Sequence, residues 1–322
     1  MHAITVTETG SPSVLDWQER SDAVAASGEV LVRTAFAGVN FIDTYHRSGL
    51  YPLPLPFVPG LEGSGRVESL GEGVTEFAVG DLVAWTDVLG SYAELVALPQ
   101  DRVVAVPPQI GAEVAAASLL QGITAHYLVN DTYPLGPGDR CLVHAGAGGV
   151  GRLLIQMAKR IGAEVFATAG GEEKVAVAKA VGADHVIDYT TQSFKDAVEA
   201  IAGPRPLNVV FDGVGAATFD AGLDLLEPCG LMVAFGNASG PVPAVDPLRL
   251  SQGGSLYLTR PTMGTHIRET ARLRQRVGSL FRAITAGDLD VAIGARFPLA
   301  DAAGAHTALE SRATTGKVLL EP

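Results

Sequence analysis

The sequence predicts an α/β fold in which a doubly wound parallel sheet is combined with a second, mostly β domain. Three observations lead to this prediction. The chain has 322 residues, which is more than one ordinary domain. Its first third contains short alternating runs separated by turns, whereas its middle alternates apolar runs with helical patterns. Repeated strand–helix units of the second kind are typical of parallel strands covered by helices on both faces.

The composition limits the classes of function that the protein is able to have. With 47% hydrophobic and 18% charged residues, the chain is typical of a globular enzyme. A net charge of −12 argues against nucleic-acid binding, which depends on lysines and arginines that neutralise phosphates. The N-terminus lacks the basic and apolar parts of a signal peptide, and no apolar stretch is long enough to span a membrane. We therefore expect a cytoplasmic protein that binds neither membrane nor nucleic acid.

The cysteines and histidines give no sign of a disulfide or of a metal site. The two cysteines, Cys141 and Cys229, lie in or beside apolar runs and are expected to be buried thiols in a reducing compartment. The seven histidines show none of the spacings that bind metals. The sequence therefore predicts no metal.

The first domain is expected over residues 1–121. The run "EVLVRTAFAGV" alternates as a strand does, and "YPLPLPFVPG" has too many prolines for anything but an extended connection. The stretch "GLEGSG", residues 60–65, is glycine-rich, but a strand-like run and not a helix follows it. It is therefore expected to be a bent strand whose glycines allow close packing, not a phosphate loop.

The second domain is expected over residues 122–262. Its strands are predicted at "RCLVHA", "EVFATA", "HVIDY", "LNVVFDGVG" and "LMVAFG", with helical segments between them. The remaining residues, 263–322, return to the first domain. There the sequence predicts one long helical stretch over 259–291, followed by a strand, a helix and a strand.

A second glycine-rich stretch, "HAGAGGVG", has the context of a dinucleotide site. Gly146, Gly148 and Gly151 form a G-x-G-x-x-G pattern that follows a predicted strand and opens a predicted helix. Glycines at these places allow backbone N–H groups and the helix N-terminus to approach a pyrophosphate. The stretch is therefore predicted to bind the cofactor.

The next strand indicates which dinucleotide binds. Proteins that bind NAD usually carry an acid at the end of this strand. Here the strand ends in Thr168, Ala169 and Gly170, and Lys174 follows within reach. The missing acid and the nearby cation favour NADPH, because a 2′-phosphate needs room and positive charge.

Several segments together resemble the medium-chain dehydrogenase/reductase superfamily, and within it the zinc-free NADPH:quinone oxidoreductase family that includes zeta-crystallin. The segments are "GVNFIDTYHRSGLYP", "VPGLEGSGRVESLGEGVTEFAVGDLV", "LLQGITAHYL", "HAGAGGVGRLLIQMAKRIGA", "VAFGNASG", "GSLYLTRP" and "ESRATTGKVLLEP". The resemblance covers nearly the whole chain. It implies a GroES-like β domain, a Rossmann domain inserted into it, and an active site in the cleft between the two.

The resemblance also implies roles for single residues. Four of them are expected to approach the nicotinamide and the substrate: Asn40, Tyr45, Tyr51 and Thr124. The others are expected to bind the cofactor: Gly146, Gly148, Gly149, Val150 and Gly151 at the pyrophosphate, Gly170, Lys174, Tyr189 and Arg312 around the 2′-phosphate, and Phe235, Asn237 and Arg260 further along.

The zinc ligands of related enzymes have no counterparts in this sequence. Asn40 stands where the zinc-dependent branch has a cysteine, and Leu61 stands where it has a histidine. The segment "LLQGITAHY" supplies no cysteine for a third ligand. A leucine offers no lone pair to a metal, so the resemblance agrees with the prediction of no metal.

The expected reaction is the zinc-independent reduction of quinones by NADPH. Alcohol oxidation requires a base or a Lewis acid, and neither is evident in the sequence. Two alternatives stay open. One is an NADPH-dependent enoyl reductase that acts on α,β-unsaturated carbonyls, and the other is a non-catalytic structural or RNA-binding role, which the negative charge disfavours. The resemblance further implies a homodimer formed through the edge strand "GSLYLTR", residues 254–260.

Overall fold

A computed structural model describes residues 1–322 and divides them into two compact units. The first unit contains Met1–Ile123 and His266–Pro322, and the second contains Thr124–Thr265. Each unit has its own sheet and its own core. The α/β fold class, with a parallel sheet in one unit and a separate β-rich unit, is confirmed.

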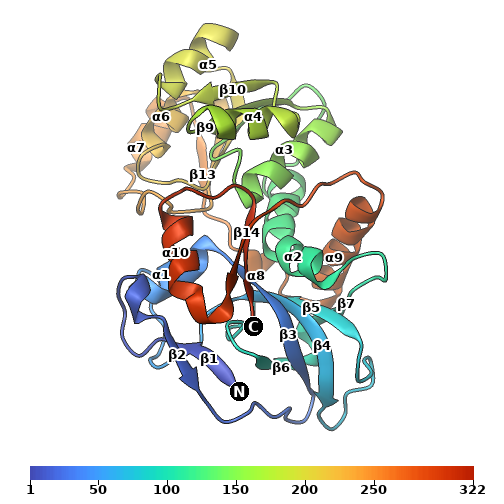
Figure 1. The fold of residues 1–322 in the computed structure, drawn as a ribbon. Coiled ribbons are helices and arrows are strands. Elements are labelled where there is room, and N and C mark those ends of the chain that lie inside the picture. Colours follow the sequence, from blue (N-terminus) through green and yellow to red (C-terminus); the bar gives the residue numbers. More distant parts are fainter. The chain divides into compact units, whose positions relative to one another are not determined.

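The second unit is a six-stranded parallel sheet in the order β10-β9-β8-β11-β12-β13. The order reverses between β8 and β11, the switch point at which ligands bind in such sheets. Figure 1 shows helices α3 to α7 around these strands, in the green-to-orange part of the chain. The strands are β8 (Arg140–Val143), β9 (Glu164–Ala169), β10 (His185–Asp188), β11 (Leu207–Asp212), β12 (Leu226–Ala234) and β13 (Tyr257–Thr259). The helices are α3 (Gly149–Ile161), α4 (Glu172–Ala180), α5 (Phe194–Ala202), α6 (Phe219–Asp224) and α7 (Pro247–Gln252).

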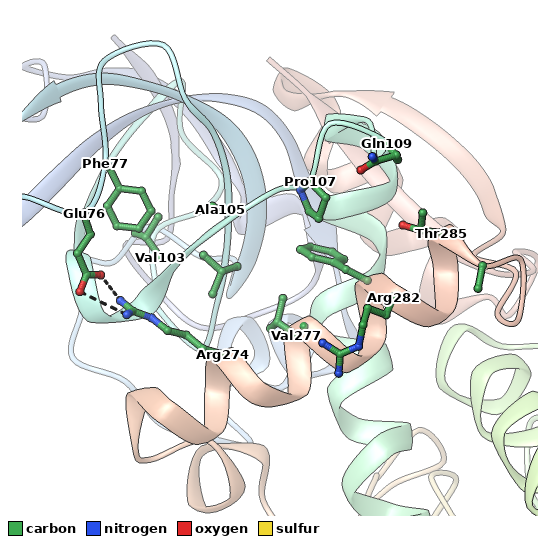
Figure 2. Close-up of a pocket in the computed structure, with 14 residues that line it drawn as sticks. Glu76, Phe77, Val103, Ala105, Pro107, Gln109, Arg274, Val277, Arg282 and Thr285 are labelled. Carbon is green, nitrogen blue, oxygen red and sulfur yellow. Dashed lines mark hydrogen bonds and ion pairs between the residues drawn. The ribbon is translucent and has the colours of Figure 1, made fainter.

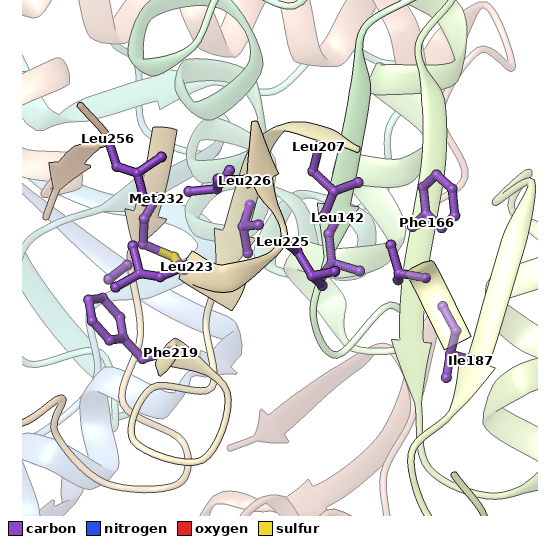
Figure 3. Close-up of a cluster of buried hydrophobic side chains, with 13 residues drawn as sticks. Leu142, Phe166, Ile187, Leu207, Phe219, Leu223, Leu225, Leu226, Met232 and Leu256 are labelled. Carbon is purple, nitrogen blue, oxygen red and sulfur yellow. The ribbon is translucent and has the colours of Figure 1, made fainter. Parts of the chain in front are cut away.

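The core of this unit lies along the sheet. Figure 3 shows how Leu142, Phe166 and Met232 extend from three different strands into one cluster of buried side chains. Phe219 and Leu223 of α6 close the cluster on one side. Strands that carry such side chains on both faces produce the short apolar runs seen in the sequence.

The first unit is built on a seven-stranded sheet in the order β14-β15-β3-β4-β5-β7, with β6 paired to β3. The strands are β3 (Glu29–Val39), β4 (Glu62–Leu70), β5 (Leu82–Thr86), β6 (Leu95–Pro99), β7 (Val103–Ala105), β14 (Ile293–Pro298) and β15 (Lys317–Glu321), and a separate hairpin pairs β1 (His2–Thr5) with β2 (Asp16–Glu19). The helices are α1 (Phe41–Ser48), α9 (Thr270–Thr285) and α10 (Ala302–Glu310). The boundary between the units falls within helix α2 (Ala112–Tyr127), which is followed by a π-helical turn at Leu128–Thr132. Helix α8 (Met263–His266) lies at the other boundary.

The "GLEGSG" stretch forms the start of β4, as predicted. A Cβ atom on Gly63 would lie 2.4 Å from the ring of Trp85, and one on Gly65 would lie 2.1 Å from the carbonyl oxygen of Arg33. The partner strand shifts register between Thr34 and Phe36, opposite this stretch. The glycines therefore permit close strand packing, and no helix starts here.

Three details of the sequence prediction were wrong. The expected long helix over 259–291 is broken into β13, α8 and α9, because Pro261 and the turn at 267–269 interrupt the helical pattern. The expected edge strand over 254–260 is reduced to Tyr257–Thr259. Cys229 is exposed, with a φ of 63°, because it lies in an irregular stretch within β12, whereas Cys141 is buried as expected.

Candidate active site

The predicted phosphate loop joins β8 to α3 at the carboxyl edge of the parallel sheet. The N–H of Gly146 donates to the carbonyl of Thr168 at 2.8 Å, and the N–H of Gly148 donates to that of Ala145 at 2.9 Å. Ala145 itself has a φ of 54°. The turn is therefore tight and is tied to the neighbouring strand β9.

The glycines of this loop leave space for a ligand, and they also allow two parts of the backbone to lie close together. A Cβ atom on Gly151 would lie 2.3 Å from the carbonyl oxygen of Ala145 and 2.9 Å from the Cα of Gly146. Helix α3 begins after Gly148, which caps the helix without a side chain. The N–H groups of its first turn and its positive dipole end are therefore able to hold an anion such as a pyrophosphate.

The end of β9 has no acidic residue. The strand ends at Ala169, and Gly170 and Gly171 lead into α4, where Lys174 lies in the first turn. A Cβ atom on Gly170 would lie 2.5 Å from the hydroxyl of Tyr189, so Tyr189 stands directly beside this glycine. The structure thus brings Gly170 and Tyr189 together.

The carboxylate that lies beside this strand end belongs to the next strand. Asp188 of β10 accepts hydrogen bonds from the N–H of Gly171 and from Thr190. Asp188 therefore stabilises the turn. The end of β9, where NAD-binding units carry the acidic residue that binds the ribose, has no acidic residue.

Phe235, Asn237 and Arg260 are grouped around the carboxyl end of β12. Arg260 donates to the carbonyl oxygens of Ala234 at 2.7 Å and Gly236 at 3.0 Å. The guanidinium therefore fixes the loop that carries Phe235 and Asn237.

His144, at the end of β8, was not singled out from the sequence. It is buried, and its Nδ1 lies 2.9 Å from the hydroxyl of Thr168, while its Nε2 has no hydrogen-bond partner. Burial lowers the pKa of His144, against the opposing effect of Asp212. Its place directly before the glycine loop was the one signal in the sequence that could have revealed it.

In the first unit, Asn40 and the two tyrosines lie at the end of β3 and along α1. Asn40 is the residue before α1, and Tyr45 lies within that helix. The rings of Tyr45 and Tyr51 meet edge to face at 5.2 Å, and the N–H of Tyr51 donates to the carbonyl of Tyr45. The structure therefore places the two rings side by side.

Asn40 also belongs to a buried polar cluster with Glu62 and Lys317, which we call the Asn–Glu–Lys cluster. Lys317 donates to the carboxylate of Glu62 and to the Oδ1 of Asn40, the latter at 2.7 Å. The Nδ2 of Asn40 donates to Glu62 at 3.0 Å. The side chains of Glu62 and Lys317 are completely buried. The lone acid between the glycines of "GLEGSG" thus has a buried cation as its partner.

A second buried network lies beside it and joins α1 to α10. Asp43 accepts hydrogen bonds from the N–H of Asn40 and the hydroxyl of Tyr92, and the Tyr92 hydroxyl also contacts Nε2 of His306. Burial raises the pKa of Asp43 to about 7. Arg47 donates to Nδ1 of His306 and pairs with Glu310. Burial, aided by the Arg47 charge, lowers the pKa of His306 to about 3.

The residues at the zinc positions do not fit a zinc ion. Leu61 is a buried hydrocarbon, and the Oδ1 of Asn40 accepts a hydrogen bond from Lys317. No group of three or more His, Cys, Asp or Glu side chains is arranged to hold a metal. The absence of metal stays a prediction.

A groove of about 950 Å³ in the first unit contains none of the predicted site residues. It lies between α9 and the segment around β7, as Figure 2 shows, with Val103, Val277 and Phe281 among its apolar residues. An ion pair between Arg274 and Glu76 lies at one end. The groove therefore does not contribute to the proposed chemistry.

The placement of two further predicted residues, Thr124 and Arg312, is known only within their own units. Thr124 is buried on α2 and is the first residue of the second unit. Arg312 follows α10 in the first unit, with a φ of 59°, whereas Lys174 and Tyr189 belong to the second. Their approach to a ligand stays a prediction.

Two family models match the chain. One, described as the alcohol dehydrogenase GroES-like domain, matches residues 26–108, and the other, described as zinc-binding dehydrogenase, matches residues 149–279. The second description names zinc, whereas no group of three or more His, Cys, Asp or Glu side chains in the structure is arranged to hold a metal. The first match lies within the β-rich unit, and the second covers most of the parallel-sheet unit and continues to residue 279 of the first unit.

Curated relatives match over nearly the full length. A quinone oxidoreductase of Pseudomonas aeruginosa is 45% identical over 97% of both chains. A 2-haloacrylate reductase of Burkholderia is 36% identical over 99% of this chain and 98% of its own. Among solved structures, the quinone oxidoreductase of Escherichia coli, complexed with NADPH, is 40% identical over the whole of both chains, with a TM-score of 0.98.

Proposed function

Because this chain belongs to the quinone oxidoreductase family of medium-chain dehydrogenases/reductases, we propose that it is an NADPH-dependent quinone oxidoreductase that works without zinc. The single observation that carries the proposal is the glycine loop at the switch point of the parallel sheet. It is followed by a strand end where two glycines and Lys174 replace the acid of NAD-binding units.

The residues of the second unit fit NADPH. Gly149, Val150 and Gly151 would donate the N–H groups of the first turn of α3 to the pyrophosphate. Gly146 and Gly148, whose N–H groups already donate to backbone carbonyls, would border it without a side chain. Gly170 leaves room for the 2′-phosphate, to which Lys174, Tyr189 and Arg312 would donate. Phe235, Asn237 and Arg260 would line the site further along. When bound, the cofactor supplies the reducing equivalent.

The residues of the first unit would serve the acceptor. A quinone needs a hydrogen-bond donor near its oxygen as negative charge develops there. The hydroxyls of Tyr45 and Tyr51 are the candidate donors, since the two rings lie side by side. Asn40, and Thr124 at the start of the second unit, complete the proposed lining. No residue here needs to remove a hydroxyl proton, so no metal is required for this reaction.

A second candidate function is the reduction of α,β-unsaturated carbonyl compounds. The 36% identity to a 2-haloacrylate reductase over nearly the whole chain favours it specifically. The same donor arrangement would stabilise the oxygen of an enone as electrons reach its double bond. The products separate the two functions, because an enone yields a saturated ketone and a quinone yields a hydroquinone.

The proposed test follows NADPH and NADH absorbance with a panel of quinones and enones. We expect turnover of quinones with NADPH and much slower turnover with NADH. Lys174→Ala should reduce the preference for NADPH roughly tenfold to a hundredfold, because one charge-assisted hydrogen bond contributes about 1.5 to 3 kcal/mol. Lys179→Ala, on the last turn of the same helix, is the matched control and should keep the preference.

Three results would contradict the proposal. Equal rates with both cofactors would refute the 2′-phosphate site, and efficient turnover of enones with inert quinones would favour the second candidate. Stoichiometric zinc in the active protein would refute zinc independence.

We also propose a cytoplasmic homodimer. The edge strand β13 carries Tyr257, which is 61% exposed, and Leu258, so a second copy could extend the sheet. Both cysteines are free thiols, in keeping with a reducing compartment. No helix of the structure has the length and apolarity that a membrane crossing requires.

A further inference from the structure

The Asn–Glu–Lys cluster is formed where three neighbouring strands of the first unit meet. Asn40 follows the end of β3, Glu62 begins β4 and Lys317 begins β15, and β3 lies between the other two. The pairing of Val318 with Val39, and of Gly63 with Ala37, puts all three residues at one end of the sheet. The strand register alone therefore brings them together.

Gly38 leaves the space in which the cluster forms. A Cβ atom at this position would lie 2.6 Å from the Oε2 of Glu62 and 2.7 Å from the Cε of Lys317. Any side chain at position 38 would therefore push the ion pair apart. The cluster depends on this close approach of β3.

The hydrogen bonds of Asn40 account for both hydrogens of its amide group. Nδ2 donates to the carbonyl of Gly38 at 3.2 Å and to the Oε2 of Glu62 at 3.0 Å, while Oδ1 accepts from Lys317. The other carboxylate oxygen of Glu62 accepts from the N–H of Leu120 at 2.8 Å. An amide group has only two hydrogens to donate, so none is left for a ligand.

The opposite orientation of the amide is excluded by the same neighbours. After a flip, Nδ2 would face the ammonium of Lys317, and Oδ1 would face the carbonyl of Gly38 and the carboxylate of Glu62. Donor would then meet donor and acceptor would meet acceptor in a site that water does not reach. The buried charges therefore select one orientation.

We propose that Lys317 is a positioning residue that fixes the side-chain amide of Asn40 so that Asn40 offers a ligand a hydrogen-bond acceptor and not a donor. The free lone pair of Oδ1 suits a ligand hydroxyl or amide N–H. A quinone oxygen, which only accepts, gains nothing from it. What this orientation means for turnover rests on the proposed function. If quinones are the substrates, the donors to the quinone oxygen are the tyrosines and not Asn40.

The test observes the amide of Asn40 directly. Asparagine-selective ¹⁵N labelling marks the side chains of Asn40, Asn130, Asn208 and Asn237, and an Asn40→Ser variant identifies the Asn40 signal. In the wild type, we expect the Asn40 NH₂ hydrogens to exchange with solvent at least about tenfold more slowly than those of the exposed Asn130.

The main variant is Lys317→Met combined with Glu62→Gln, which leaves no buried charge unpaired. The glutamine keeps its oxygen toward the N–H of Leu120 and its NH₂ group toward Asn40, so the Asn40 amide must flip and release Gly38. We expect faster exchange of the Asn40 hydrogens and a changed chemical shift. Unchanged exchange and shift would overturn the proposal.

A matched control is Lys195→Met combined with Asp224→Asn, which neutralises an exposed lysine–aspartate pair. Its Asn40 signals and its activity should equal those of the wild type. With a quinone that the wild type reduces, the Lys317→Met/Glu62→Gln variant should lose roughly tenfold to a hundredfold in kcat, because its flipped Asn40 would no longer accept a hydrogen bond from a hydroxyl or amide N–H of NADPH and would position the cofactor less well. Its far-ultraviolet circular dichroism should stay unchanged.

Amide exchange and kcat together distinguish a failure of this proposal from a failure of the proposed function. A wild type that reduces no quinone contradicts the proposed function, yet its amide exchange still tests the role of Lys317. A flip without a change in kcat would overturn the link between Lys317 and turnover. Changes in the control equal to those in the main variant would overturn the proposal as well.

Discussion

Gly151 shows how one missing side chain determines the phosphate loop. Its Cα lies so close to the backbone of Ala145 and Gly146 that a methyl group would overlap both. Backbone atoms cannot rotate away as the end of a long side chain can, so the whole turn would have to move. The sequence pattern predicted the tight turn, because such a turn requires glycine at a fixed spacing, and the role of Gly151 at the cofactor stays a prediction.

We therefore expect Gly151→Ala to weaken NADPH binding roughly tenfold or more, and to reduce stability by about 1 to 3 kcal/mol. Fluorescence titration gives the Kd and thermal unfolding gives the stability. Gly278→Ala in α9 is the control, since its Cβ would meet only the end of Arg282 at 3.4 Å. The control should bind NADPH normally and gain about 0.5 to 1 kcal/mol. Wild-type affinity in Gly151→Ala would contradict the assignment of the loop.

Lys317 and His306 mark the limit of prediction at single residues. Lys317 bonds to Asn40, 277 positions away, and His306 bonds to Arg47, 259 positions away. Local patterns carry no information about such pairs. A lysine that begins a strand and a histidine within a helix are ordinarily exposed or half-buried, so their burial could only be seen in the fold.

Among the elements, those with strong periodicity or special turn residues were predictable. The strands and helices around the glycine loop and the β4 strand occur as expected, because apolar runs and glycines determine them locally. The break between α8 and α9 and the exposed Cys229 were not predicted. In both places, irregular backbone interrupts a run of residues whose composition suits a regular element.

Helix α10 carries a testable pH dependence through His306. The folded protein keeps this side chain neutral down to its pKa of about 3, whereas the unfolded chain is protonated at the ordinary value of 6.5. The unfolded state therefore binds more protons between these values. Stability contributed by the neutral His306 is thus complete above 6.5 and is lost as the pH falls toward 3.

His306→Gln removes this titration but retains a donor for Tyr92 and an acceptor for Arg47. We expect the free energy of unfolding of the wild type, relative to the variant, to fall by about 1.4 kcal/mol for each pH unit between roughly pH 6 and pH 4. Urea unfolding at several pH values measures this difference. Asp43, whose pKa is raised by burial, changes the stability with pH in the opposite direction, but it is present in both proteins and its effect cancels. His2→Gln, at a partly exposed site, should follow the wild type. Parallel curves for His306→Gln and the wild type would contradict the buried neutral state.

For the whole molecule, the class of fold was predictable because it follows from repetition. Alternating strand–helix units require a parallel sheet, and the order found here reverses at the predicted glycine loop. The seven-stranded sheet of the first unit combines strands from residues 29–105 and 293–321. That combination came from the family resemblance, since no local pattern reveals which distant strands will pair.

The proposed dimer is a property of the whole molecule. Tyr257→Asp should convert the dimer into monomers in sedimentation velocity at micromolar concentration, because a buried unpaired carboxylate at the sheet edge is costly. Val24→Asp is the control, as Val24 is 79% exposed in the first unit, and it should stay dimeric. A wild type that sediments as a monomer, or a dimer that tolerates Tyr257→Asp, would contradict the edge-strand interface.

The distance along the chain between Asn40 and Lys317 has a consequence for synthesis on the ribosome. The second unit is one continuous segment and is able to fold as soon as it has emerged, whereas β3 and β4 must wait for β15. Until Lys317 has been translated, Glu62 has no ammonium partner and stays hydrated. Since β15 is then also missing, the edge of β3 with which β15 pairs remains open to water. The second unit of a nascent chain is therefore expected to be complete, and able to bind cofactor, before the first unit has closed its sheet.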